Sequence, residues 1–539
     1  MVTEMNKEKN EFLNLVVYQI YPRSFYDSNG DGIGDLNGIR AKIPYLKQLG
    51  INAVWICPCY KSPNYDNGYD IADYRDIMDE FGTFDDWKKL AAELHLNGIK
   101  IIMDLVVNHT SSEHYWFKQA RLSKDNSYHD YYIWADKPLN DWTACFGGSA
   151  WEYNPQTNEY YLHSFAVQQP DLNWENPKVR KECCDIVDFW ADLGVDGFRC
   201  DVLDFISKDF ENDKKLNGPR LHEYIKLLFD REKVRRLFTV GECQSDVKSI
   251  CDICGKDRNE LKSVFQFEHI SFGRTDKYHS ASYSHDQIKN ALIKWQNFTA
   301  EHDLLYILFT DNHDQPFFLS RFGNDRELRY ECATAYAGMI YLLKGIPFIY
   351  QGQEFGSANS YFNDISMFND VETVNYYKEN IEKIGTDKND LIKQINFGSR
   401  DNTRRPVAWT DKAPNYGFTT GNPWLTMSSR AKEINLEKDI KSEKSVFEFY
   451  KNVLQLRKES EIIRFGTFKD ITENDGCFVY ERELDDNKIV VAVNFDKQNN
   501  VTLPDYLKRD GYKTILANYK NAEPFDENFR PFEIRVFSK

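Results

Sequence analysis

The stretch IIMDLVVNHT at residues 101–110 decides the fold of this chain. Apart from Asp104, its first seven residues are apolar, as in a strand that is buried on both faces, and it ends in Asn108 and His109. Similar runs occur at residues 15–21, 53–57, 197–202, 237–242, 264–267, 305–312 and 347–350. Helical patterns lie between most of them, at residues 39–49, 84–96, 179–193, 221–229 and 326–343. Buried strands that alternate with helices predict an α/β fold, a (β/α)8 barrel of the TIM type.

Two parts of the chain do not fit the barrel pattern. About 70 residues rich in Trp, Tyr, Asn and Ser separate the third strand from the next helix, which is more than a βα loop needs. Beyond Leu456, segments such as CFVYERE and KIVVAVNF alternate or run apolar with turns between them. The sequence therefore predicts a barrel of residues 1–108 and 174–456, an inserted small domain of residues 109–173, and a C-terminal antiparallel β-sandwich domain of residues 457–539.

Composition limits the partners. The 539 residues carry a net charge of −16 and no basic tract longer than three residues, which argues against nucleic acid as a partner. The N-terminus has no apolar signal segment, and no run of 18 apolar residues occurs, so we expect a cytoplasmic protein without a membrane partner. The eleven cysteines are then expected to be reduced thiols, and the C-x-x-C of Cys251 and Cys254 lacks a second pair for zinc.

Polar side chains stand at the ends of several predicted strands. Active sites of (β/α)8 barrels lie at the C-terminal ends of the strands. Arg199 and Asp201 are two residues apart, so both side chains point to one face of the fourth strand. Glu242 ends the fifth strand, and His313 and Asp314 end the seventh. We expect these side chains to meet at one end of the barrel.

Two of these carboxylates suit acid–base chemistry. An arginine beside Asp201 favours its ionised form, whereas partial desolvation near other carboxylates raises the pKa of Glu242. One ionised and one protonated carboxyl group are the minimum needed to break a glycosidic bond. Any single carboxylate could instead be a satisfied ion pair or a helix cap. Polar clusters at the ends of four strands are harder to explain in that way, because buried charge is costly.

The segments DLVVNH, GFRCDV, VGE and NHD resemble, in this order, the four signature regions of glycoside hydrolase family 13, the α-amylase family. YQIYPRSFYDSNGDGIGDL, QPDLNW and SRDNTRRP are similar to the oligo-1,6-glucosidase and dextran glucosidase branch. The resemblance covers nearly the whole chain. It implies a retaining, exo-acting α-glucosidase that hydrolyses terminal α-1,6-linked glucose from small isomalto-oligosaccharides.

The resemblance also implies roles by position. Asp201 matches the nucleophile that forms a covalent glucosyl-enzyme, Glu242 the acid/base and Asp314 the third acid. The pocket for the reacting glucose is expected to be formed by Asp66, Tyr69, His109, Phe165, Gln169, Arg199, Val202, His313 and Arg404. Arg404 matches the arginine that pairs with Asp66. Val202, next to the nucleophile, is typical of relatives that cleave α-1,6 bonds, although a valine there could equally be a barrel-core residue.

The loop from Asp27 to Asp35 predicts a metal site. Its D-x-N-x-D-G opening is typical of half an EF-hand, but the twelfth position is Gly38, which cannot supply the bidentate carboxylate. In the family this loop holds a structural cation, and oxygen ligands suit Ca²⁺ or Mg²⁺. The implied ligands are Asp27, Asn29, Asp31, the Ile33 carbonyl and Asp35. The alternative is a solvated turn. We expect the protein to be a monomer.

Three differences from the sequences typical of this branch leave the identity of the leaving group undetermined. Phe317 stands where the branch usually has Arg, Arg405-Pro-Val-Ala-Trp409 differs from its usual motif, and Cys243 follows Glu242. A trehalose-6-phosphate hydrolase, or an α-1,4-preferring or sucrose-acting α-glucosidase, would share this core. A phosphosugar enzyme needs cations at the pocket mouth, for which Lys277, Arg321 and Arg405 are candidates. FFLSRFGND does not match the charged loop of sucrose isomerases, and the presence of all three acids disfavours a non-catalytic relative.

Overall fold

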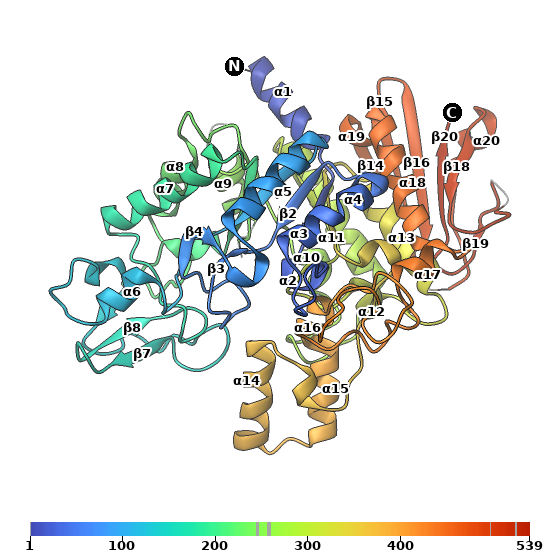
Figure 1. Ribbon diagram of the computed structural model, residues 1–539. Coiled ribbons are helices and arrows are strands. Elements are labelled where there is room, and N and C mark those ends of the chain that lie inside the picture. The colour runs from blue at the N-terminus through green and yellow to red at the C-terminus, as the bar shows by residue number, and fades with distance from the viewer. Residues whose placement is uncertain (1, 244–246, 256–259, 496, 523–524) are drawn as a thin grey trace.

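The computed structural model describes residues 2–243, 247–255, 260–495, 497–522 and 525–539 (Figure 1). Eight parallel strands form a nearly closed barrel in the order β11-β10-β9-β5-β2-β1-β13-β12, which confirms the predicted fold. Their bounds are β1 Val17–Ile20, β2 Ala53–Ile56, β5 Lys100–Val106, β9 Gly197–Asp201, β10 Phe238–Gly241, β11 Ser263–Val264, β12 Ile307–Leu308 and β13 Ile346–Tyr350. Between the two end strands, the Ser263 hydroxyl donates to the Leu305 carbonyl at 2.8 Å.

The register of the strands sets the position of the polar residues. In β5 and β9, Asp104 lies opposite Arg199 and Val106 lies opposite Asp201. On the other side of β9, Arg199 lies opposite Val240 of β10, two residues before Glu242. Every residue of β9 and β10 is buried. The charged side chains of Arg199 and Asp201 are therefore largely shielded from water.

Helices cover the barrel much as the pattern predicts. α5 (Phe84–Leu96) and α8 (Leu221–Phe229) have the predicted bounds, and α7 (Pro177–Asp192) and α13 (Arg329–Tyr341) lie within two or three residues of theirs. The predicted helix at residues 39–49 is wrong, because two helices occupy this stretch, α3 (Leu36–Ala41) and α4 (Ile43–Leu49). Pro44 lacks the amide hydrogen that a continuous helix needs and sits instead in the first turn of α4.

The long segment after β5 contains a helix and a small sheet. The helix is α6 (Tyr115–Ala120), and the sheet consists of the antiparallel strands β6 (Trp134–Ala135), β8 (Glu159–Leu162) and β7 (Trp151–Asn154). Trp151 and Leu162 belong to a small apolar cluster of this segment, whereas Phe117 and Tyr161 pack into the main core. An isolated bridge between His109 and Asp171 joins the two ends of the segment next to the barrel. The predicted inserted domain falls on this segment, whereas its limits stay a prediction.

The C-terminal part is an antiparallel sheet, as predicted. Its five strands run in the order β14 (Thr467–Asp470), β15 (Cys477–Leu484), β16 (Asn487–Asn494), β20 (Ile534–Ser538) and β18 (Lys513–Ala517). Phe478 and Tyr480 pack into the main core, while Cys477 and Val479 face a separate cluster. This alternation buries both faces of the sheet. Among the residues described in this part of the chain, β17 (Asn499–Asn500) and β19 (Asn528–Phe529) form a separate two-stranded sheet.

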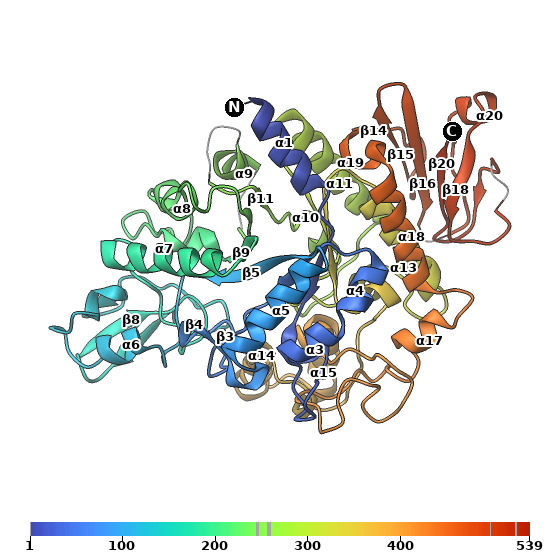
Figure 2. The same cartoon turned by 45° about the horizontal axis from the view of Figure 1, so that its top comes forward.

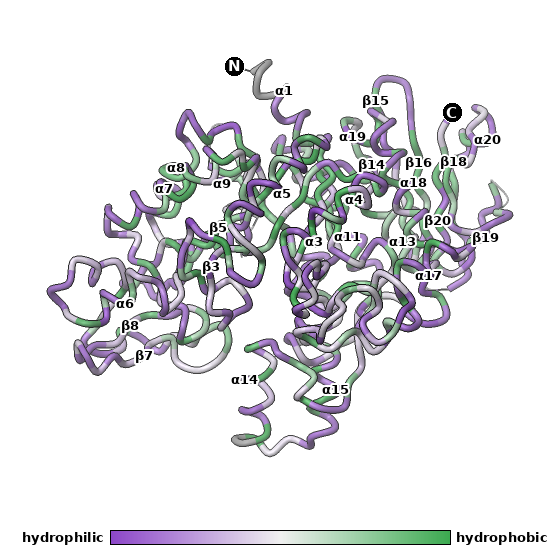
Figure 3. Tube along the Cα trace, viewed as in Figure 1, coloured by the Kyte–Doolittle hydropathy of each residue, from purple (hydrophilic) through white to green (hydrophobic). Residues whose placement is uncertain are grey.

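A helical hairpin projects from the barrel where the sequence predicted no element. It consists of α14 (Val371–Glu379) and α15 (Lys388–Gly398), followed by the short α16 (Asp401–Arg404). Figure 1 and Figure 2 place this hairpin at one end of the molecule and α1 (Val2–Leu13) at the other. Figure 3 shows hydrophobic stretches along the interior strands and hydrophilic stretches in the outer loops. Among the helices that the structure describes, none has both the length and the apolar character to cross a membrane.

Candidate active site

Arg199 is the centre of the polar cluster at the C-terminal ends of the strands. Its Nη1 lies 2.7 Å from Asp104 Oδ1 and 2.7 Å from Asp201 Oδ1, and its Nη2 forms an ion pair with Glu242. Its guanidinium group also lies over the Trp55 ring, 5.1 Å from the centroid. One guanidinium group therefore bridges Asp201 and Glu242 and holds the two carboxyl groups near each other, as the spacing along the strands predicted.

Burial dominates the protonation of this pair. It raises the pKa of Asp201 well above its ordinary value, with Glu242 and Asp104 adding to the rise and Arg199 opposing it. Burial likewise raises the pKa of Glu242. Arg199 opposes this rise, but it shares its charge among three carboxylates. Both carboxyl groups are therefore harder to ionise than carboxyl groups in water.

His313 and Tyr69 form a stacked layer beside the pair. Their ring centroids are 5.3 Å apart with an interplanar angle of 8°. The Gln19 amide nitrogen can only donate, so His313 Nδ1, 2.8 Å away, accepts and the ring proton is on Nε2. That Nε2 lies 2.6 Å from the Tyr69 hydroxyl and 3.0 Å from Asp314 Oδ2. Burial lowers the pKa of His313, so the ring is a neutral donor.

Two arginines hold the third acid. Arg404 Nη2 lies 2.8 Å and Arg400 Nη1 3.3 Å from Asp314 Oδ1. Burial alone would raise the pKa of Asp314, but His313, and after it Arg404 and Arg400, hold it well below its ordinary range. Arg400 Nη2 also lies 3.3 Å from Asp66 Oδ1, so the predicted pairing of Asp66 with Arg404 is wrong. Arg404 turns the other way, because its Nε donates to the His313 carbonyl at 2.8 Å.

The inserted segment closes one side of the site. Gln169 Nε2 lies 3.1 Å from Asp66 Oδ2 and 3.1 Å from His109 Nε2. Burial lowers the pKa of His109 to about 4, so its ring is neutral at pH 7. The Phe165 ring stands 5.1 Å from the His109 ring. The predicted pocket residues on this side are therefore neighbours in space.

Val202 lies just beyond the end of β9 and is not a barrel-core residue. Its side chain is partly exposed, and its φ of 34° and ψ of 47° are left-handed. A β-branched residue is strained in that region, so the surrounding structure must hold it there. The next amide, of Leu203, donates to the Glu242 carbonyl at 3.2 Å. The turn at Val202 thus joins the backbones that carry Asp201 and Glu242.

Four residues near the site have no role in the sequence prediction. Asp104 was noted only as part of its strand, although it contacts Arg199. Asp370, fully buried, accepts from Arg400 Nε at 2.9 Å, and the Phe146 ring lies 4.9 Å from the Arg400 guanidinium. Arg400 could have been found, since it stands four residues before Arg404 in a quoted motif. Asp370 and Phe146 lie in irregular segments without a periodic pattern.

The predicted metal loop is held by its own hydrogen bonds. The Asp27 carboxylate accepts from the amides of Asn29, Gly30 and Gly32 at 2.7–2.9 Å and from the Thr419 hydroxyl. Those four bonds use the usual accepting capacity of a carboxylate. In the described part of the chain, no three His, Cys, Asp or Glu side chains gather as metal ligands. The oxygen chemistry of Asn29, Asp31 and the Ile33 carbonyl fits a hard cation, whereas Asp27 already shapes the loop.

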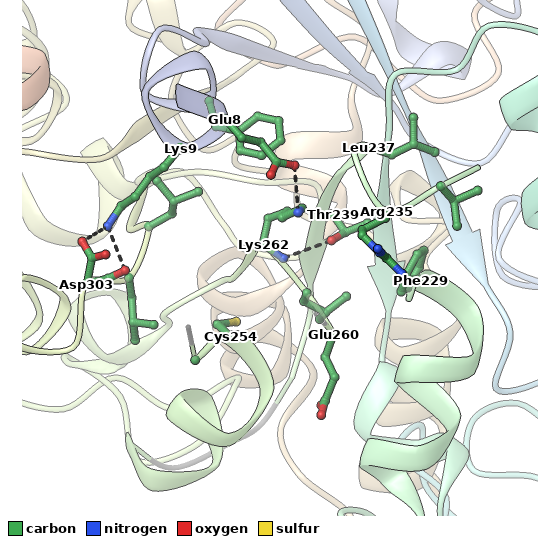
Figure 4. Close-up of a pocket in the computed structure, with 16 residues that line it drawn as sticks. Glu8, Lys9, Phe229, Arg235, Leu237, Thr239, Cys254, Glu260, Lys262 and Asp303 are labelled. Atoms are coloured by element: carbon green, nitrogen blue, oxygen red, sulfur yellow. Dashed lines mark hydrogen bonds and ion pairs between the residues drawn. The ribbon is translucent and has the colours of Figure 1, made fainter. Parts of the chain in front are cut away.

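A cavity of about 130 Å³ that is open to solvent lies elsewhere, against α1 and the starts of β10, β11 and β12 (Figure 4). Its charged residues are paired, Lys9 with Asp303 and Lys262 with Glu8, the latter at 2.9 Å. None of the three acids lines it. The cavity is therefore separate from the carboxylate cluster.

Comparisons with known proteins agree over almost the whole chain. The family model described as "Alpha amylase, catalytic domain" matches residues 19–466. An oligo-1,6-glucosidase from Parageobacillus thermoglucosidasius is 46% identical, with 97% of this chain and 98% of the relative covered. Among solved structures, a trehalose-6-phosphate hydrolase from Bacillus licheniformis has a TM-score of 0.90 at 39% identity, with 98% and 99% covered. A trehalulose synthase variant has a TM-score of 0.93 at 37% identity, with 98% and 100% covered.

Proposed function

Because the chain belongs to the alpha-amylase family, we propose that it is a retaining, exo-acting α-glucosidase. Membership makes it a glycoside hydrolase. The observation that carries the finer proposal is the single guanidinium group of Arg199 between Asp201 and Glu242, two carboxyl groups whose pKa values burial raises. Retaining hydrolysis needs two carboxyl groups about 5–5.5 Å apart, one ionised and one protonated.

In the proposed reaction Asp201 attacks the anomeric carbon while Glu242 protonates the departing oxygen. A covalent glucosyl-enzyme forms on Asp201, and Glu242 then removes a proton from the water that hydrolyses it. Glu242 must therefore be protonated, and Asp201 ionised, at the start of the reaction. Its side chain is 22% exposed against 9% for Asp201, which supports this assignment because the proton donor has to reach the leaving oxygen.

The surrounding residues support the binding of one glucose. Asp314 stays anionic between Arg404 and Arg400 and can accept hydrogen bonds from sugar hydroxyls. His109 and His313 are neutral and can donate or accept at the same sugar. Such fixed polar groups orient a substrate without having to reorganise during the reaction.

Contacts across the site support exo action. The Asp66–Arg400 ion pair rests on Phe146 of the inserted segment, and Asn375 of α14 donates to the Phe146 carbonyl at 3.4 Å. The hairpin and the inserted segment therefore meet beside the acids. A site closed on one side in this way admits a chain end and excludes the middle of a polysaccharide.

We propose α-1,6-linked glucose at the non-reducing end of isomalto-oligosaccharides as the substrate. The oligo-1,6-glucosidase relative supports this, as does the branched Val202 at the start of the turn after the nucleophile. Of the cations considered for a phosphorylated substrate, Lys277 pairs with Glu372, and Arg405 donates to two backbone carbonyls and stacks on Phe362 at 4.0 Å. Arg321 donates to the Phe272 carbonyl and has no carboxylate contact among the described residues.

We also propose a structural Ca²⁺ or Mg²⁺ in the Asp27–Asp35 loop, held by its oxygen ligands. A monomeric state and a cytoplasmic location stay predictions.

A substrate panel tests the proposed function. Isomaltose, isomaltotriose, maltose, sucrose and trehalose are compared by kcat/KM under identical conditions. Isomaltose should exceed maltose by about 10- to 200-fold, the usual reach of shape discrimination in a pocket. In Val202→Thr the ratio should fall toward one. A preference for maltose in the wild type would reject the α-1,6 proposal, and failure to release glucose from any of them would reject the glucosidase.

A further inference from the structure

Two arginines near the third acid have no acidic partner. Arg274 Nη1 donates to the side-chain oxygen of Gln315, the residue after Asp314, at 2.9 Å. Arg321 Nη2 donates to the Phe272 carbonyl at 3.0 Å, two residues before Arg274. Within the described ranges, neither guanidinium group has a carboxylate oxygen within 4.0 Å. Both side chains are only partly exposed, so solvent does not fully screen their charge.

Neighbouring cations differ in this respect. Lys277 pairs with Glu372, and Arg400 and Arg404 share Asp66, Asp314 and Asp370. The two arginines therefore lack a direct carboxylate contact, although the charges of Glu372, Asp276 and Asp311 act on them from further away. Burial, with Arg274 as the next contribution, lowers the pKa of Arg321 to about 9, and burial lowers the pKa of Arg274. An anion between them would offset both the mutual repulsion and the loss of hydration.

The two side chains are held in place from both sides. Arg274 belongs to a loop closed by an isolated bridge to Ser280, and Tyr278 of that loop stacks on Tyr376 of α14 with centroids 3.9 Å apart. Arg321 is part of the short helix α12 (Phe318–Phe322). Gln315 is fixed in turn, because its carbonyl accepts from the Thr403 hydroxyl at 2.9 Å. Fixed guanidinium groups lose little freedom on binding a ligand.

Their position points to the leaving half of the substrate. The closed side of the site is formed by Asp66, Arg400 and Phe146. The charge of Glu372, which pairs with Lys277, acts on Arg274. Lys277 and Arg274 share one loop, which packs on the hairpin through Tyr278. The arginines thus stand beside Asp314 and Glu372, on the side of the site where the sugar that leaves during hydrolysis would lie.

We propose that Arg274 and Arg321 form a binding site for an anionic group on the leaving sugar, a phosphate ester being the chemistry that suits two guanidinium groups. Guanidinium groups match phosphate oxygens with paired, charge-assisted hydrogen bonds. The inference rests on the proposed glucosidase function and adds a second substrate class to the neutral oligosaccharides proposed above, α-glucosides with a phosphorylated leaving sugar. It is independent of the linkage that is cleaved.

Product-like inhibitors provide the first test. Hydrolysis of p-nitrophenyl α-glucoside by the full chain is inhibited with glucose, glucose 6-phosphate or inorganic phosphate. Glucose 6-phosphate should bind about 10- to 100-fold more tightly than glucose, the usual strength of hydrogen bonds to charged groups. Equal inhibition constants for the two sugars would overturn the proposal. Inorganic phosphate binding as tightly as glucose 6-phosphate would also overturn it, because the site would then recognise a free anion.

Variants locate the effect. Arg274→Gln should bring the ratio of the two inhibition constants close to one, whereas Arg274→Lys, which keeps the charge but not the paired hydrogen bonds, should keep part of it. Lys378→Gln, on an exposed position of α14, removes the same charge and should leave the ratio unchanged. A ratio that falls equally in Lys378→Gln would reduce the effect to net charge and overturn the site.

Matched substrates separate this inference from the proposed function. Trehalose and trehalose 6-phosphate share one linkage, so the ratio of their kcat/KM values reports only the phosphate. A ratio of one, with neutral glucosides still hydrolysed, would overturn the anion site and leave the glucosidase intact. If no α-glucoside is hydrolysed, the proposed function fails instead. Calorimetric titration then compares the dissociation constants of glucose 6-phosphate and glucose. Equal constants would reject the anion site.

Discussion

At the scale of single residues, the site depends on how one positive charge is shared. Arg199 contacts Asp104, Asp201 and Glu242, and burial of the cluster raises the pKa of the last two. The two-residue spacing of Arg199 and Asp201 was enough to place them on one face. The contact with Asp104 depends on the register between β5 and β9, which residues far apart in the sequence set together. Local spacing cannot reveal such a pairing.

Asp201→Asn should leave a folded protein with less than about a thousandth of the wild-type kcat. The amide cannot form the covalent intermediate, while its shape and its place beside Arg199 are kept. Steady-state kinetics on p-nitrophenyl α-glucoside, with circular dichroism as the check on folding, give the answer. More than a few per cent of the wild-type kcat in a folded variant would show that another group is the nucleophile.

Glu242→Gln should lose the high-pH limb of the activity profile. The raised pKa of Glu242 keeps the acid protonated to a higher pH than an ordinary glutamate, so kcat/KM should fall only as the pH rises through that value. The variant has no proton to lose there. Its burst on p-nitrophenyl α-glucoside should change little, since the leaving group is already good, whereas isomaltose hydrolysis should slow by about 10²- to 10⁴-fold. Equal losses on both would contradict the acid role.

At the scale of elements, strands and helices with a clear hydrophobic periodicity were predicted, whereas segments without one were not. The buried strands and the helices α5 and α8 follow directly from hydrophobic periodicity. The hairpin α14–α15 and the segment around Phe146 carry no comparable signal. They contribute to the site through single contacts, such as the one between Arg400 and Phe146. The pocket wall is therefore the part that a sequence pattern predicts least well.

Chelation should test the Asp27–Asp35 loop. If a cation is bound only in the folded state, EDTA should lower the melting temperature, and added Ca²⁺ or Mg²⁺ should restore it, with kcat almost unchanged. Asp31→Asn is the matched variant, because Asp31 is exposed and accepts one amide hydrogen bond that asparagine can keep. An identical melting temperature after verified metal removal would mean that the hydrogen bonds of Asp27 hold the loop without a cation.

At the scale of the whole molecule, the C-terminal sheet is attached to the barrel through buried arginines. Arg482 of β15 donates to the carbonyl of Leu342 at 2.9 Å and to that of Ile463 at 2.8 Å. It is fully buried, and burial lowers its pKa to about 10. The sequence predicted the barrel and the sheet separately, since each has its own periodicity. Their attachment depends on carbonyl groups that no sequence pattern marks.

Arg482→Met should destabilise the protein by about 2–5 kcal/mol without changing kcat, because the buried carbonyls lose their donors. Urea unfolding followed by fluorescence measures the change. Lys469→Met, at an exposed position of the adjacent strand β14, removes the same charge and should have little effect. Similar stabilities for the two variants would mean that Arg482 does not hold the sheet to the barrel.

If Asp201 and Glu242 act as proposed, hydrolysis proceeds in two displacements at the anomeric carbon. Proton NMR of isomaltotriose hydrolysis, recorded in the first minutes before mutarotation, distinguishes this route from a single displacement. Two displacements return the anomeric carbon to its starting configuration, so the first glucose to appear should be the α-anomer. Initial release of β-glucose would contradict the account, because it requires a single displacement by water and leaves Asp201 without a covalent role.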